Sequence, residues 1–157
     1  MKYEFIKKDI DSFELIFTNK DNQEIVKPFK RTIEMAKRLD GITAEARIKL
    51  ITKLSQMGLK KDDLVVKTDL GNGQVVYDES NYKLLEDEMI QETSLLITNE
   101  LIEKCFNKNV KDLLEEMGID TNSEKLSNDI STQITLFTQK FLSIITGKEE
   151  QAPSTQE

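Results

Sequence analysis

Short runs of hydrophobic and polar residues alternate along the first thirty positions and are rich in Phe, Ile, Val and Tyr. Residues 13–18 (FELIFT) and 23–29 (QEIVKPF) show this pattern, and residues 2–6 (KYEFI) precede them. A period of two is typical of half-buried strands, and the Asn/Asp-rich stretch between the runs is typical of a turn. The pattern predicts a β-hairpin of the two runs, with Pro28 at its end, where a missing N–H costs least.

From Arg31 the spacing of apolar residues becomes helical. Ile33, Met35, Ala36 and Leu39 predict a first short helix that ends at Asp40-Gly41. A second helix follows, with Thr43 as its N-cap and Gly58 as its end. Its apolar positions are Ile48, Leu50, Ile51, Leu54 and Met57.

Residues 62–80 (DDLVVKTDLGNGQVVYDES) place β-branched pairs on either side of two glycines. Gly-x-Gly also begins many phosphate-binding loops, but a Walker loop needs a different spacing and a lysine, and a dinucleotide loop needs a third glycine before a helix. The calcium-loop pattern fails too, because positions 69, 71 and 73 are Asp, Gly and Gly. The stretch therefore predicts a second hairpin with a glycine turn.

The second half of the chain has helical periodicity. A long helix is predicted from Ser80 to Phe106, and a short one at 109–120 ended by Gly118. A last helix carries Leu126, Ile130, Ile134, Phe137, Phe141 and Ile144 at spacings of 4, 4, 3, 4 and 3. Such a narrow apolar stripe packs either in the core of the same domain or against a partner helix, and the pattern leaves both open.

The fold class that follows is α+β and mainly α, with small N-terminal antiparallel hairpins and short helices, then a C-terminal helical bundle. A single domain is predicted over 1–147, with a strand-containing half at 1–78 and a helical half at 79–147. Residues 148–157 (KEEQAPSTQE) are polar and predict a disordered tail.

Charge is unevenly distributed along the chain. Residues 1–78 hold 15 Lys+Arg against 13 Asp+Glu, net +2, while residues 79–157 hold 7 against 16, net −9. Such a division indicates two surfaces with different partners, copies that stack head to tail, or simply unequal solvated faces.

Candidate chemistry is sparse. The chain of 157 residues has no histidine, the commonest general base and metal ligand, and one cysteine, Cys105, on the apolar side of the long helix. The carboxylate pairs at 62–63, 87–88 and 115–116 are adjacent in sequence and point apart on a helix. We therefore expect no enzyme, no catalytic residues, no cofactor and no metal. The N-terminus lacks a signal-peptide core and no run is long enough to span a membrane, so we expect a protein of the cytoplasm without a membrane partner.

Nucleic acid is the alternative partner to consider. Two short helices broken at LDGIT have the outline of a helix-turn-helix, and basic residues cluster around them. Acidic residues are interleaved, and the overall pI of about 4.8 disfavours binding to phosphate. A small DNA-binding regulator using the basic helices at 30–57 stays as the alternative function. The clustered cations are Lys27, Lys30, Arg31, Lys37, Arg38, Arg47, Lys49 and Lys53.

The order of elements resembles a known family. Strands (YEFIKKDIDSFELIFTNKDNQEIVKPFK), short helices (RTIEMAKRLDGITAEARIKLITKLSQMGL), longer helices and a polar tail together resemble the tail assembly chaperones of long-tailed (siphovirus-type) bacteriophages of Gram-positive hosts. The resemblance is one of layout over most of residues 1–147.

This resemblance implies a non-enzymatic protein of the bacterial host cytoplasm that binds the tape measure protein and helps recruit tail tube subunits during tail morphogenesis. Self-association is expected as well. The family has no catalytic residues to transfer to this chain. We predict the partner contact on the stripe of the last helix, at Ile130, Ile134, Phe137, Phe141 and Ile144.

Overall fold

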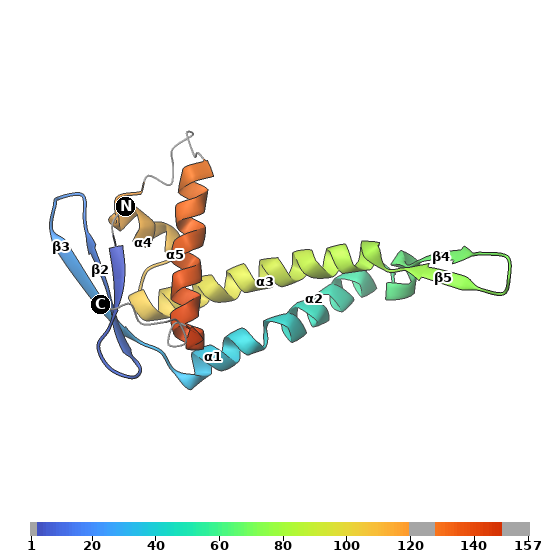
Figure 1. The fold of residues 1–157 in the computed structure, drawn as a ribbon, viewed down its shortest axis with the longest axis horizontal. Coiled ribbons are helices and arrows are strands. Elements are labelled where there is room, and N and C mark those ends of the chain that lie inside the picture. Colours follow the sequence, from blue (N-terminus) through green and yellow to red (C-terminus); the bar gives the residue numbers. More distant parts are fainter. Residues whose placement is uncertain (1–2, 120–127, 149–157) are drawn as a thin grey trace. The chain divides into compact units, whose positions relative to one another are not determined.

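Antiparallel strands and helices make up the chain in a computed structural model that describes residues 3–119 and 128–148 (Figure 1). The fold is mixed α+β and mainly helical, so the predicted class is confirmed. The strands are β1 (Tyr3–Lys7), β2 (Ser12–Thr18), β3 (Glu24–Lys30), β4 (Val66–Asp69) and β5 (Val75–Asp78). The helices are α1 (Ile33–Asp40), α2 (Ile42–Gln56), the short 3-10 helix η1 (Lys61–Leu64), α3 (Ser80–Phe106), α4 (Val110–Glu116) and α5 (Asn128–Thr146).

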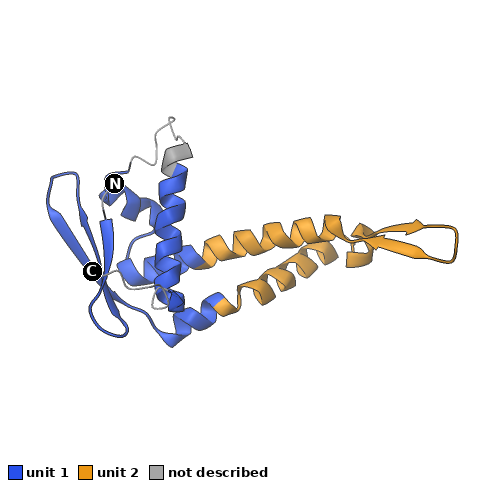
Figure 2. Ribbon diagram, viewed as in Figure 1, with its two compact units in different colours: residues 1–39, 98–157 blue, residues 40–97 orange. Residues whose placement is uncertain are grey.

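The chain forms two compact units, unit 1 of residues 1–39 and 98–157 and unit 2 of residues 40–97 (Figure 2). One boundary lies at the end of α1 and the other lies inside α3. The predicted halves, 1–78 and 79–147, are therefore each divided between the two units. Of the predicted tail, residues 149–157 lie outside the described residues.

Unit 1 contains a three-stranded antiparallel sheet in the order β1-β2-β3. Phe13 of β2 pairs with Phe29 of β3, and Leu15 pairs with Phe5 of β1, which confirms the predicted first hairpin and adds β1 to it. Because side chains alternate between the faces of a strand, this register gathers Tyr3, Phe5 and the aromatic residues of β2 and β3 on one face.

That face is covered by helices. The Phe137 ring lies 5.5 Å from the Phe5 ring, and the Phe106 ring lies 5.0 Å from the Phe29 ring, between ring centroids. Aromatic pairs at such distances stabilise beyond their buried area. The buried sheet residues of unit 1 are Phe13, Leu15, Phe17 and Phe29. Its buried residues from α3, α4 and α5 include Leu101, Ile102, Phe106, Leu113, Leu114, Phe137, Phe141, Ile144 and Ile145, and Met117, the C-cap of α4, is buried as well.

Pro28 lies inside β3, two residues before its end, and not at the end of the hairpin as predicted. The hydrogen bond from Arg31 N to Asp11 O, at 3.0 Å, continues the ladder between β2 and β3. Hydrogen-bonded and non-bonded pairs alternate along an antiparallel ladder, so Phe29, two residues before Arg31, is also hydrogen-bonded to β2. The backbone nitrogen of Pro28 therefore points away from β2, toward the outer edge. Proline costs little there, because β3 is an edge strand.

Arg31 joins the sheet to the end of α5. Its guanidinium donates to Asp11 Oδ1 at 3.1 Å, to the backbone oxygen of Ile10 at 2.8 Å and to that of Ile144 at 2.9 Å. The same group lies 5.2 Å from the centre of the Phe13 ring. The Ile144 carbonyl also accepts from Gly147 N at 3.1 Å, so Arg31 adds a second donor to it at the end of α5, where the last carbonyls lack the usual helical donors.

Unit 2 is built on α2 and the first part of α3, which lie side by side (Figure 2). An ion pair between Arg47 Nε and Glu86 Oε2, at 3.3 Å, joins the two helices. Their shared core is small. It consists of buried Leu50, Leu54 and Tyr82, with Leu59, Leu64, Leu85 and Met89 partly buried around them.

The start of α2 differs from the prediction. Gly41 is its N-cap and has helical backbone angles, φ −86° and ψ −1°, whereas Thr43 lies within the first turn. The chain passes from α1 to α2 with little break, so no extended residue is available to cap the helix with a side chain. Of the predicted apolar positions, Leu50 and Leu54 are buried, and Ile48 and Ile51 are exposed.

The second predicted hairpin is confirmed by the antiparallel pairing of β4 and β5. Its turn uses Gly71 at φ 87° and Gly73 at φ 71°, in the left-handed region that favours glycine. Asp69 Oδ1 accepts a hydrogen bond from Gly71 N at 2.9 Å. The glycines thus serve the turn, as the sequence indicates.

Candidate protein-binding site

The predicted contact stripe of α5 lies mostly in the core of unit 1. Phe137 and Phe141 are 0% exposed and Ile144 is 3% exposed. Ile134 is half-buried, and the side chain of Ile130 lies outside the described residues. The apolar stripe left two alternatives open, and Phe137, Phe141 and Ile144 follow the first of them, packing in the core of the same unit. Phe137 and Phe141 can meet a partner only if α5 leaves the sheet, whereas Ile144 also lines the groove described next.

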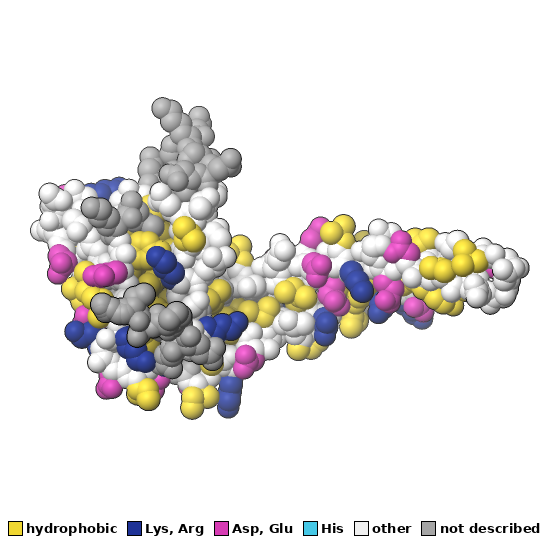
Figure 3. All heavy atoms as spheres, in the orientation of Figure 1, with side chains coloured by type: hydrophobic (Ala, Val, Ile, Leu, Met, Phe, Trp, Pro, Cys, Tyr) yellow, Lys and Arg dark blue, Asp and Glu magenta, His cyan; other side chains and the backbone are white. Residues whose placement is uncertain are grey.

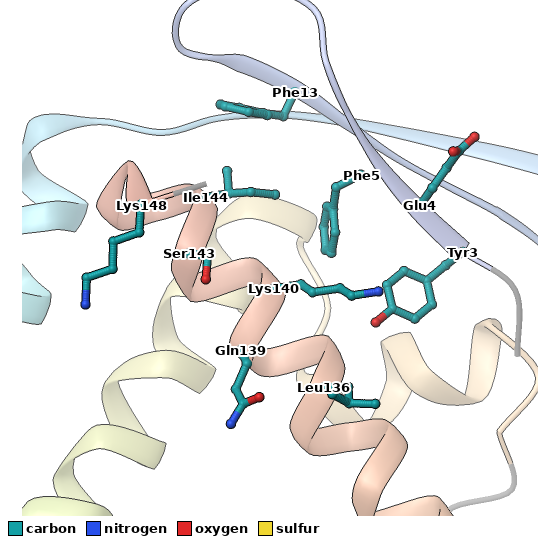
Figure 4. A pocket seen from close by; sticks show the side chains of 10 residues that line it. All are labelled: Tyr3, Glu4, Phe5, Phe13, Leu136, Gln139, Lys140, Ser143, Ile144 and Lys148. Carbon is teal, nitrogen blue, oxygen red and sulfur yellow. The ribbon is translucent and has the colours of Figure 1, made fainter. Parts of the chain in front are cut away.

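A groove opens beside the stripe, between β1 and α5 (Figure 4). Its volume is about 620 Å³, in the range of pockets that hold a ligand. The strand side is formed by Tyr3 and Phe5 with Phe13 of β2, and the helix side includes Leu136 and Lys140. We call this feature the β1–α5 groove.

The sequence builds this groove from two periodicities. Tyr3 and Phe5 are two residues apart on β1 and therefore share the helix-covered face of the sheet. Leu136 and Lys140 are four residues apart on α5 and therefore lie one above the other. Each directly precedes a buried phenylalanine, so this row runs alongside the core stripe. This row was not predicted, although a leucine that lies just off an apolar stripe can be read from the sequence.

Apolar groups line much of the groove, and the charged residues among its lining are Glu4, Lys140 and Lys148. Leu136 is 48% exposed, and Tyr3 is half-buried. Burial also raises the pKa of the Tyr3 hydroxyl. Lys140 Nζ lies 5.1 Å from the centre of the Tyr3 ring, and Lys148 lines the same groove. A segment with apolar side chains and a nearby carboxylate has complementary chemistry to this surface.

β1 is an edge strand of the sheet. The hydrogen bond from Lys8 N to Ser12 O, at 2.8 Å, continues the ladder between β1 and β2. Alternation along an antiparallel ladder then directs the backbone groups of Tyr3 and Phe5 away from β2. The strand that lines the groove thus also carries outward-facing donors and acceptors, a feature that extended segments use when they bind sheet edges.

Cys105 has the properties of a structural thiol. It is half-buried on α3, and burial raises its pKa to about 11, a shift that the nearby Lys104 only partly opposes. A thiol with such a pKa stays protonated and unreactive near neutral pH. Within residues 3–119 and 128–148, no group of three or more Cys, Asp and Glu side chains is placed to hold a metal ion.

Many of the clustered cations at 27–53 are engaged with acidic groups. Lys27 pairs with Glu116 at 3.2 Å, and Arg38 pairs with Glu100 at 3.1 Å, both in unit 1. In unit 2, Arg47 pairs with Glu86, and Lys49 pairs with Glu45. Arg31 is held by Asp11 and two backbone oxygens.

None of the helices in the described part of the chain combines the length and the apolar character that crossing a membrane requires. Comparisons of the chain with protein-family models, with curated proteins and with solved structures found no match.

Proposed function

We propose that this chain is a non-enzymatic assembly chaperone that binds a segment of a client protein in the β1–α5 groove. The observation that carries the proposal is the groove itself, a hollow of about 620 Å³ between β1 and α5 in which aromatic and aliphatic side chains lie beside two lysines and one glutamate. The resemblance of layout names the client: the tape measure protein of a phage tail, held until tail tube subunits are recruited.

The chemistry of the groove supports an amphipathic client segment. Tyr3, Phe5 and Leu136 offer contacts to apolar anchor side chains, which supply most of the affinity at such sites. Lys140 and Lys148 outnumber Glu4 in the lining and so favour a segment that carries carboxylates next to its anchors. A long helical client presents such anchors at spacings of three and four residues.

The DNA-binding alternative has less support. A cation that is already paired with a carboxylate contributes less to phosphate binding, because the pair must be broken or the carboxylate repels the phosphate. Arg31, Arg38 and Arg47 are all held in this way.

The test is co-expression of the client with variants of this chain. Leu136→Asp places a charge in the groove at an exposed position, so the fold tolerates it while apolar anchors are rejected. We expect the wild type to keep the tape measure protein soluble and Leu136→Asp to lose most of this effect. Ile10→Asp is the matched control, because Ile10 is also exposed, at 70%, and does not line the groove. A client that is as insoluble with the wild type as without it would overturn the proposal.

The charge at the rim has its own test in the same assay. Lys140→Glu should weaken client binding, and the loss should shrink as salt is raised, because screening reduces both attraction and repulsion. Lys111→Glu on α4 changes net charge equally, outside the groove. If Lys140→Glu and Lys111→Glu weaken client binding equally, Lys140 has no specific role in binding.

A further inference from the structure

The hairpin of β4 and β5 exposes every one of its residues. The pairing of Val66 with Asp78 and of Thr68 with Val76 puts Val66 and Val76 on one face, and Val75 and Tyr77 lie on the other. Figure 3 shows hydrophobic side chains at the surface of this hairpin. An isolated two-stranded hairpin is marginally stable in water and gains stability when strands are added to it.

The outer edge of β4 has a defined hydrogen-bonding pattern. Leu70 N donates to Gln74 O at 3.0 Å, so residues 70 and 74 are a hydrogen-bonded pair at the turn. Bonded and non-bonded pairs alternate in an antiparallel ladder, which makes Lys67 and Asp69 non-bonded positions toward β5. The backbone N–H and C=O groups of Lys67 and Asp69 therefore point outward from β4.

We propose that β4 binds β4 of a second copy of this chain, antiparallel, around a two-fold axis at Thr68. In this register Lys67 lies opposite Asp69 of the second copy, and Asp69 lies opposite its Lys67. Both residues carry the outward backbone groups, so each pair exchanges backbone hydrogen bonds and also brings opposite charges together. Val66 comes to lie opposite Leu70 of the second copy. The product is a four-stranded sheet in which the two β4 strands are central.

Charge complementarity selects a second copy as the occupant. A lysine on an edge strand normally discourages strand addition, because it has no partner there. In a two-fold pairing the sequence Lys67-Thr68-Asp69 supplies its own counter-charge. The contact is isologous, so it closes as a dimer and does not propagate. A sheet joined along one short strand buries little area, so we expect a weak dimer that forms at high protein concentration.

Charge reversal tests the register. Lys67→Glu and Asp69→Lys should each weaken self-association by on the order of tenfold, since each homodimer then has two like-charged pairs. An equimolar mixture of the two variants should dimerise like the wild type, because every pair in the heterodimer is again of opposite charge. Sedimentation velocity over a concentration series measures all three. A wild type that stays monomeric throughout, or a mixture that is no better than its components, would overturn the proposal.

Cross-linking tests the axis without altering charge. In a Cys105→Ala background, Thr68→Cys should oxidise rapidly to a disulfide dimer, because Cα atoms of a non-bonded antiparallel pair lie about 4.5 Å apart, within disulfide range. Val76→Cys is the matched control, on the same face and opposite Thr68 within the hairpin. Its two copies would lie three strands apart, roughly 14 Å. Equal rates for the two variants would contradict the proposed axis. This inference does not depend on the client, so its failure leaves the chaperone proposal standing.

Discussion

Glu116 is the acceptor of two lysines in unit 1. Its Oε1 lies 2.8 Å from Lys108 Nζ and 3.2 Å from Lys27 Nζ, which connects α4 to β3. Burial acts to raise the pKa of this carboxyl, but the hydrogen bonds and charges of the two lysines outweigh it, so the pKa lies below its ordinary value of 4.5. The folded protein therefore binds this proton less readily than the unfolded chain does.

The expected result is a loss of stability in acid that depends on this residue. Above the ordinary carboxyl pKa the contribution of Glu116 is fully present, and it is lost as the pH falls through the lowered folded pKa. Glu116→Gln should lower the free energy of unfolding by about 1 kcal/mol at neutral pH and flatten its pH dependence below pH ~4.5. Urea denaturation across this range measures both, with Glu103→Gln on α3 as the control. An unchanged pH dependence in Glu116→Gln would show that the lysines do not perturb the carboxyl.

At the scale of elements, α5 presents two neighbouring rows with different surroundings. Phe141 is 0% exposed in the core, and Leu136 is 48% exposed in the groove. Phe141→Ala should destabilise unit 1 by about 3–5 kcal/mol, because it leaves a cavity against the sheet. Leu136→Ala should cost no more than about 0.5 kcal/mol. Thermal unfolding of the two variants makes the comparison. A small loss of stability in Phe141→Ala would instead indicate that the stripe is a partner surface.

The elements themselves were predictable because each has a local cause. The period of two predicted β2 and β3, and the glycines predicted the turn between β4 and β5. Gly118, at φ 95°, lies just past α4 as expected. The cap of α2 at Gly41 was not predictable, since it follows from how closely α1 precedes it. The groove was not predictable either. It exists because Tyr3 and Leu136, far apart in sequence, line one hollow, and only the tertiary fold decides that.

At the scale of the whole molecule, the uneven charge along the chain does not separate the two units. Unit 1 holds 15 Lys+Arg against 18 Asp+Glu, net −3, and unit 2 holds 7 against 11, net −4. The acidic half of the sequence contributes to both, because the boundary lies inside α3. The division of charge between residues 1–78 and 79–157 therefore does not follow the division into units.

Apolar burial distinguishes the units more clearly than charge does. The core of unit 2 has Leu50, Leu54 and Tyr82 at its centre. Several large apolar residues of the same unit are exposed, including Ile48 at 65% and Ile51 at 60%. Burial of apolar surface is the main favourable term in folding, at about 25 cal/mol per Å². Unit 2 should therefore open at a lower free energy than unit 1.

Native-state hydrogen exchange tests this difference. We expect amides of α2 and of α3 before Ile97 to exchange through openings of lower free energy than amides of β2 and β3. Leu54→Ala should remove about 2–4 kcal/mol of protection within unit 2 and leave the sheet of unit 1 nearly unchanged. Leu101→Ala, a buried leucine of α3 in unit 1, is the matched control and should do the reverse. If either substitution lowered protection equally along the whole of α3 and the sheet, the units would open as one, and the small core of unit 2 would not set its stability.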